Sequence, residues 1–182
     1  MPSWFAKLLI KLWGWKHKGC FPPQEVKKYV LLAAPHTSWQ DLFIDVFTRA
    51  ANKTKIGFLG KAALFKFPQG IFLKWLEGIP VDRSSSSNKV DAVIKMFESK
   101  EEFAICLAPE GTRQKVEKLR SGFYHIAKGA KVPLVLCTLD FENKIISFSE
   151  PYYLTKDQDS DFKYIWNYFK GVKGKNPELS IN

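Results

Sequence analysis

A chain of 182 residues is long enough to form one domain with a substantial hydrophobic core. Hydrophobic residues make up 46% of the chain and aromatic residues 15%, which excludes wholesale disorder. The 28 Lys and Arg residues outnumber the 18 Asp and Glu residues, for a net charge of +10. This excess predicts an anionic partner: a nucleic acid, a membrane surface or a phosphorylated substrate.

The first 20 residues carry apolar side chains at the spacing of one wide face of a helix. That face comprises Trp4, Phe5, Leu8, Leu9, Leu12 and Trp13, which we call the α-helical stripe. Lys7 and Lys11 fall on the opposite side of the helix. Tryptophan beside lysine is typical of the interface between bilayer and water. We therefore predict an amphipathic membrane-docking helix in residues 1–20; the alternative is a helix that packs on its own domain.

From residue 21 onward, short apolar runs alternate with segments of helical periodicity. The predicted strands are 29–34, 55–59, 79–82, 103–108, 133–139 and 145–148, and the predicted helices are 39–51, 62–75, 89–100, 122–128 and 162–170. This alternation is typical of the α/β class. We expect residues 21–182 to form a single domain, with a mixed, mostly parallel β-sheet flanked by helices. Glu142 and Asn143 predict a hairpin turn between the last two strands.

His36 and Asp41 lie between the first of these strands and the helix that follows it. The carboxyl end of a strand is where α/β sheets place their functional sites. A carboxylate on one ring nitrogen fixes the imidazole tautomer, and it supports the imidazolium that forms when the other nitrogen accepts a proton. The pair therefore predicts a general base and its orienting group. The same carboxylate also fits a capping box with Ser38, and both roles can coexist.

Arg83 and Arg113 both follow predicted strands, so both can reach the sheet edge that carries the histidine. Guanidinium groups bind phosphate through two parallel hydrogen bonds. Beside the second arginine, Gly111 permits close backbone approach and Thr112 can donate a hydroxyl hydrogen bond. Glu110 would repel a phosphate, so we expect it to orient an arginine or to hold an acceptor hydroxyl. Together these residues predict an anion-binding constellation.

Four blocks occur in this order: His36-Thr-Ser-Trp-Gln-Asp41, Val81-Asp82-Arg83, Glu110-Gly-Thr-Arg113 and Val132-Pro-Leu-Val135. They resemble the four motif blocks of the glycerolipid acyltransferases, a family that includes the 1-acylglycerol-3-phosphate (lysophosphatidate) acyltransferases. The resemblance covers about residues 29–140. It implies that His36 and Asp41 are base and orienter, and that Arg83 and the third block bind the glycerol phosphate. Lys61 matches a basic residue of many relatives and is expected to be a secondary phosphate contact.

The implied reaction moves a fatty acyl group from acyl-CoA or acyl carrier protein to a hydroxyl of a lysophospholipid, such as 1-acylglycerol-3-phosphate, in phospholipid biosynthesis. The thioester is a co-substrate, and we expect no metal, no bound cofactor and no acyl-enzyme. Combined with the N-terminal helix, the resemblance predicts a peripheral, monotopic protein on the cytoplasmic face of a membrane, with an anionic lipid surface as a partner.

Three other readings are weighed against this one. For nucleic-acid binding, the sequence has no zinc-ligand spacing, no recognition-helix motif and no aromatic block of the RNA-binding kind. A lipid-binding relative without turnover and an acyl-thioester hydrolase both stay open. Cys20, Cys106 and Cys137 cannot all be paired and lack metal-ligand spacing, which favours a reducing compartment.

Overall fold

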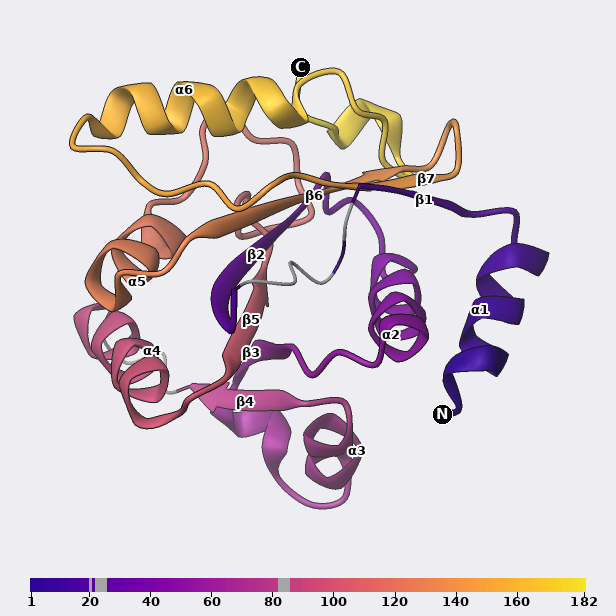
Figure 1. The fold of residues 1–182 in the computed structure, drawn as a ribbon, viewed down its shortest axis with the longest axis horizontal. Helices are drawn as coiled ribbons and strands as arrows, with labels where there is room; N and C mark the ends of the chain where they lie inside the picture. The colour runs from indigo at the N-terminus through magenta and orange to yellow at the C-terminus, as the bar shows by residue number, and fades with distance from the viewer. Residues whose placement is uncertain (20, 22–25, 82–85) are drawn as a thin grey trace.

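The computed structural model describes residues 1–19, 21, 26–81 and 86–182. These residues form an α/β domain around a seven-stranded sheet with strand order β1-β7-β6-β2-β5-β3-β4 (Figure 1). The strands are β1 (Lys16–Lys18), β2 (Lys28–Ala34), β3 (Gly57–Lys61), β4 (Gly78–Val81), β5 (Phe103–Leu107), β6 (Leu134–Asp140) and β7 (Ile145–Phe148). Neighbouring strands are parallel except β6 and β7, which form the predicted antiparallel hairpin. The prediction of a mixed, mostly parallel sheet is confirmed.

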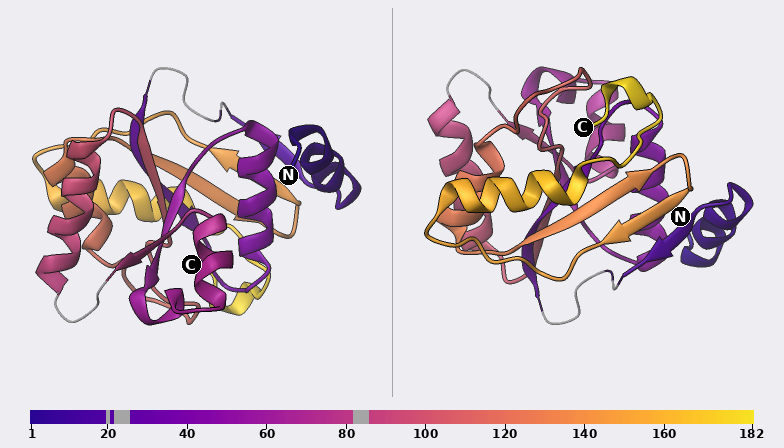
Figure 2. Two further views of the ribbon diagram at one scale, coloured as in Figure 1. Left: turned by 90° about the horizontal axis from the view of Figure 1, so that it is seen from below. Right: turned by 90° about the horizontal axis from the view of Figure 1, so that it is seen from above.

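Helices cover both faces of this sheet, as Figures 1 and 2 show. One face carries α1 (Ser3–Leu12) and α2 (Asp41–Asn52), and the other carries α4 (Ser86–Ser99), α5 (Gly122–Ala130) and α6 (Gln158–Phe169). Between β3 and β4 the chain forms a 3-10 turn, η1 (Ala62–Phe65), and the short helix α3 (Gln69–Trp75). A second 3-10 turn, η2 (Pro177–Leu179), lies near the C-terminus.

The central strand β2 is buried on both faces because successive side chains of a strand point to opposite sides. Val30 and Leu32 belong to the core beneath α4, α5 and α6, whereas Tyr29 and Leu31 belong to the core beneath α1 and α2. Such a strand reads in sequence as a continuous apolar run, which is typical of parallel sheets. β2 is therefore a rigid support for the loop that follows it.

Two of the predicted elements need correction, and one strand was not predicted. The helix predicted at 62–75 is two pieces, η1 and α3, because Pro68 has no N–H to donate and cannot sit inside a continuous helix. The last helix begins at Gln158 rather than 162, where Asp157 accepts hydrogen bonds from two backbone N–H groups of the first turn. β1 was not predicted, because its three residues are all exposed and polar and it exists only by pairing with β7.

The predicted N-terminal helix is present, and it packs on α2 through Ala6 and Ile10, which are buried. These two residues are not part of the α-helical stripe. Most of that stripe is exposed, from Trp13 at 37% to Leu12 at 75%, and only Leu9 is half-buried. Among the described residues, no helix has the length and apolar character required to cross a bilayer.

Candidate active site

His36 lies on the loop between β2 and α2, at the carboxyl end of the central strand. Its Nδ1 is 2.9 Å from Oδ2 of Asp41, whose side chain is 4% exposed, while that of His36 is 28% exposed. The same carboxylate oxygen accepts the backbone N–H of Ser38 at 3.0 Å. Asp41 thus contacts both the imidazole and the backbone just before α2, whose N-cap is Gln40 and has no side-chain cap hydrogen bond.

The tautomer of His36 follows from its two ring contacts. A proton on Nδ1 is donated to Asp41, which leaves the lone pair of Nε2 to accept. Nε of Arg113 lies 3.2 Å from Nε2 and donates to it. This pattern fits a neutral imidazole whose accepting nitrogen faces solvent beside an arginine. The geometry is that of a base oriented by a carboxylate, but in this structure Arg113 occupies the lone pair of Nε2, so its side chain must turn away before Nε2 can accept a proton.

Glu110 lies on the loop after β5 and is 2% exposed. Its Oε1 accepts the backbone N–H of His36 at 2.7 Å. Sequence reasoning assigned Glu110 to an arginine or to an acceptor hydroxyl; the structure brings it to the backbone of the histidine. Burial raises the pKa of the Glu110 carboxyl, and the hydrogen bond from His36 partly offsets that rise.

After Glu110, the path of the loop depends on the backbone of Gly111 and on a hydrogen bond to Thr112. Gly111 has φ of +67°, and a Cβ there would lie 2.9 Å from Cγ of Arg120. Glycine therefore fits both the left-handed conformation and the close approach. Oγ1 of Thr112 accepts the backbone N–H of Gln114 at 3.2 Å, which tightens the turn that presents Arg113.

The two remaining predicted phosphate contacts are only partly described. Lys61 is the last residue of β3, in register with Val81 of β4. The carboxyl ends of these parallel strands lie on the same edge of the sheet as those of β2 and β5, so the backbone of Lys61 is on the expected edge. Arg83 lies outside the described residues.

A contact that sequence reasoning missed holds the loop from its other side. Asn176, near the C-terminus, donates its backbone N–H to Oγ1 of Thr37 at 3.1 Å and its side-chain Nδ2 to the Thr37 carbonyl at 2.8 Å. A Cβ on Gly174 would lie 2.6 Å from the same Oγ1, so the two segments are in close contact. No local signal could reveal a pairing between residues 139 positions apart.

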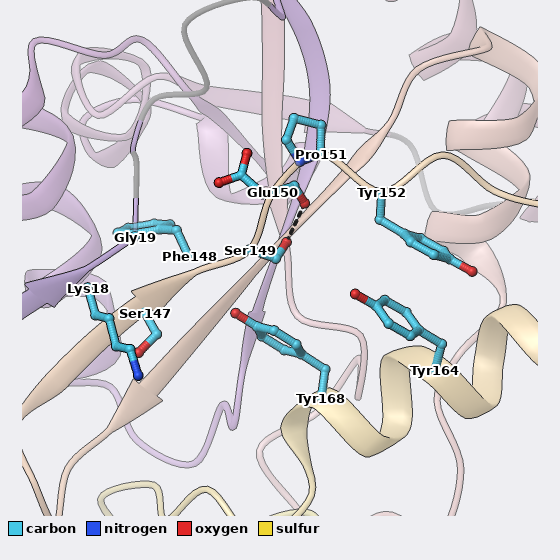
Figure 3. Close-up of a pocket in the computed structure, with 10 residues that line it drawn as sticks. All are labelled: Lys18, Gly19, Ser147, Phe148, Ser149, Glu150, Pro151, Tyr152, Tyr164 and Tyr168. Carbon is cyan, nitrogen blue, oxygen red and sulfur yellow. Dashed lines mark hydrogen bonds between the residues drawn. The ribbon is translucent and has the colours of Figure 1, made fainter.

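Two hollows are found on the domain. A cavity of about 550 Å³ lies between the β1–β7 edge and α6, where Tyr152, Tyr164 and Tyr168 line it (Figure 3). None of the predicted site residues belongs to its lining. A hollow of about 730 Å³ adjoins the Glu110 loop through Ala108 and Arg120, and has an apolar floor. In the part of the chain that the structure describes, no cluster of His, Cys, Asp and Glu has the arrangement of a metal site.

Comparisons with known proteins identify the family of the chain. The family model described as "Acyltransferase" matches residues 21–139, well over half of the chain. The chain therefore belongs to this acyltransferase family. Its fold is similar to the crystal structure of the 1-acyl-sn-glycerophosphate (LPA) acyltransferase PlsC from Thermotoga maritima, with a TM-score of 0.64 and 18% identity over 91% of this chain and 74% of that one. A search of curated protein sequences finds no match.

The buried Glu110 carboxyl predicts a pH dependence of stability. Its pKa in the folded protein is raised above the ordinary value of 4.5, so the folded protein binds a proton more tightly than the unfolded chain does. The stabilisation from that proton is present below the unfolded pKa and is lost as pH rises through the folded pKa. Relative to Glu110→Gln, the wild type should therefore lose free energy of unfolding as pH rises from 4.5 through the raised pKa, with no further change above it.

Urea unfolding of both proteins between about pH 4 and pH 8 measures this difference. Glutamine keeps an oxygen that can accept the N–H of His36, so loss of that hydrogen bond does not complicate the comparison. A wild type that gains stability over the variant in the same window would show that the anion, not the acid, is favoured at this position.

Proposed function

We propose that this protein is an O-acyltransferase that moves a fatty acyl group from a thioester to a hydroxyl of a lysophospholipid such as 1-acylglycerol-3-phosphate. The observation that carries the proposal is the His36–Asp41 pair at 2.9 Å, in a chain of the acyltransferase family. A free hydroxyl attacks a thioester poorly, and a positioned base removes its proton as the new bond forms. A neutral imidazole with an accepting Nε2 is such a base.

The proposed chemistry is a direct transfer. Nε2 of His36 takes the proton of the acceptor hydroxyl while the oxygen attacks the thioester carbonyl carbon. The imidazolium that results is stabilised by the buried carboxylate of Asp41. As the tetrahedral intermediate collapses, the carbon–sulfur bond breaks and the proton passes from the imidazolium to the leaving thiolate. No acyl-enzyme, metal or bound cofactor enters the cycle, and the acyl thioester is a co-substrate.

Arg113 is the proposed principal contact for the acceptor's phosphate. Its Nε donates to Nε2 of His36 in this structure, and when the guanidinium turns to an anion its N–H donors bind that anion and the lone pair of Nε2 is released for the hydroxyl proton. This proximity supports a phosphate held within a few ångströms of the base, as a small glycerol phosphate headgroup requires. Arg83 and Lys61 are proposed as additional contacts, because both follow or end strands whose carboxyl ends share this edge. Glu110, Gly111 and Thr112 shape the loop that carries Arg113.

The exposed α-helical stripe supports a second part of the proposal, that the protein docks peripherally on the cytoplasmic face of an anionic membrane. α1 packs on the domain through Ala6 and Ile10, and of the stripe Trp13 contacts Phe47 of α2. Trp4, Phe5, Leu8 and Leu12 are exposed and can make another contact. Lys7 and Lys11 are both exposed, and each can meet a lipid phosphate. A lipid acceptor would then be reached from the surface in which it resides.

Replacement of the base gives the first test of the chemistry. His36→Ala should lower acyl transfer by about 10²–10⁴-fold, or roughly 3–5 kcal/mol of barrier, with the fold unchanged. Asp41→Asn should cost less, because the imidazole remains but its tautomer is no longer enforced. Mass spectrometry of the lipids formed from a panel of lysophospholipids measures the rates. Wild-type turnover by purified His36→Ala would refute the mechanism, and release of free fatty acid without transfer would identify a hydrolase.

Arg113 tests the assignment of the acceptor. Arg113→Ala should raise KM for the lysophospholipid by about 10–100-fold, since a charge-assisted contact contributes roughly 1.5–3 kcal/mol. Arg113→Lys should recover only part of this, because a point charge cannot replace the two parallel hydrogen bonds of the guanidinium. Rates are measured against acceptor and thioester concentrations separately. An effect confined to the thioester would show that Arg113 serves the donor instead.

The α-helical stripe can be tested without disturbing the core. Trp4 and Leu12 are 67% and 75% exposed, so Trp4→Ser combined with Leu12→Ser should leave the fold intact and weaken vesicle binding. Deleting residues 1–18 would be a poorer test, because it also removes Ile10 from the core and β1 from the sheet. Co-sedimentation with phosphatidylglycerol vesicles measures binding, which should weaken but persist at high salt. Undiminished binding of the double variant would refute docking through this stripe.

A further inference from the structure

A second cluster of exposed apolar side chains lies on η1, α3 and the turn between them. Large apolar residues usually avoid water when they can pack, yet five here are more than half exposed. This α3 patch comprises Leu64 at 55%, Phe67 at 84%, Ile71 at 66%, Phe72 at 59% and Trp75 at 66%. The rings of Phe72 and Trp75 are stacked with centroids 6.0 Å apart, so at least these two form one continuous surface.

The segment is fixed to the domain on its inner side, so the patch faces outward from a rigid support. A Cβ on Gly70 would collide with the backbone of Phe65, which shows how closely α3 packs against η1. Leu76, directly after α3, is buried. Its carbonyl accepts a hydrogen bond from Nη1 of Arg49 at 3.3 Å, and this guanidinium also bonds to the carbonyl of Ile56 and to Asp45. The exposed side chains are therefore not needed to hold α3 in place.

The charged residues within the segment that carries the α3 patch, residues 62–76, are two exposed lysines, Lys66 and Lys74. Glu77, which is also exposed, follows directly after the segment, so the positive charge lies within the segment itself. Aromatic rings that prefer the headgroup region, beside ammonium groups that meet lipid phosphates, are complementary to an anionic bilayer. Aliphatic side chains among them can reach the acyl chains.

The position of the patch connects it to the candidate active site. η1 follows directly from the carboxyl end of β3, on the edge of the sheet where the His36 and Glu110 loops lie. In Figure 1, α1 and α2 lie to the right of the central strands, and α3 lies beyond the edge strand β4. Near the start of α2, Trp39 is 62% exposed and Phe43 is 42% exposed. These exposed aromatic residues follow the His36 loop, and contacts through Phe47 connect them to Trp13 at the end of α1.

We propose that the α3 patch is a second membrane-docking element, which enters the interface of a bilayer that contains anionic lipid. It extends the docking proposed for α1, and it does not depend on the chemistry at His36. Two separate elements, α1 and the α3 patch, hold the domain against the bilayer and fix its orientation, which a single short helix leaves free to rotate. The His36 loop then opens toward the lipid surface.

The test uses the full chain with Phe67→Ser and Trp75→Ser as separate variants. Vesicles of phosphatidylcholine with and without phosphatidylglycerol are the probe, and co-sedimentation gives the partition coefficient. Each serine variant should lower partitioning into the anionic vesicles by about tenfold, because a large apolar side chain no longer leaves water. Trp75→Phe keeps an apolar ring and should bind nearly as the wild type does. Tyr153→Ser is the matched control, since Tyr153 is 63% exposed but lies outside the patch.

Depth of insertion gives an independent readout. Brominated phosphatidylcholine should quench tryptophan fluorescence more in the wild type than in Trp75→Phe, because the difference reports Trp75 alone. Circular dichroism checks that every variant is folded. Unchanged partitioning of both serine variants would overturn the proposal. A dimer in the absence of lipid that the serine variants convert to a monomer would also overturn it, because the patch would then bind a second copy of this chain. A selective loss of binding to an acidic acyl carrier protein would overturn it as well.

Discussion

The candidate active site depends on the contacts that hold the short loop between β2 and α2 in place. Glu110 holds the backbone of His36, and Asp41 holds its ring. Asn176 holds the next residue, Thr37. Each contact comes from a different part of the chain. A general base is useful only if its accepting nitrogen points at the reacting hydroxyl, and a loop gains such precision only from surrounding contacts. The site is therefore assembled by the fold rather than by the loop alone.

The two buried carboxyl groups at this loop differ in the hydrogen bonds that they accept. Oδ2 of Asp41 accepts two hydrogen bonds, from the imidazole of His36 and from the backbone N–H of Ser38, so the carboxylate is placed to support an imidazolium. Glu110 has one such bond and a raised pKa, which means that burial of its charge costs stability. The same buried carboxyl fixes the position of His36, so the protein is less stable but its site is pre-organised. Arg113, on the solvent side, places a positive charge beside the imidazole.

The sheet brings this chemistry and the exposed apolar face together. Because β2, β3 and β5 are parallel neighbours, the loops that follow them emerge on one edge, and these loops lead into α2, into η1 and α3, and into the Glu110 turn. The exposed aromatic residues of α1, α2 and α3 follow from the same arrangement. An enzyme whose acceptor resides in a bilayer would require such a geometry, since the base must face the surface from which the lipid enters.

The sequence by itself determined what depends on local spacing or on whole motif blocks: the α/β class, the His36–Asp41 pair five residues apart, the amphipathic α1 and the family. Only the tertiary structure decided which distant groups meet. Glu110 reaches the backbone of His36 across 74 positions, and β1 exists only beside β7. The exposure of the apolar residues Phe67, Ile71 and Trp75 is likewise a property of the fold. The physical reason is that hydrophobicity and spacing describe single elements, whereas strand order and packing decide which faces are covered.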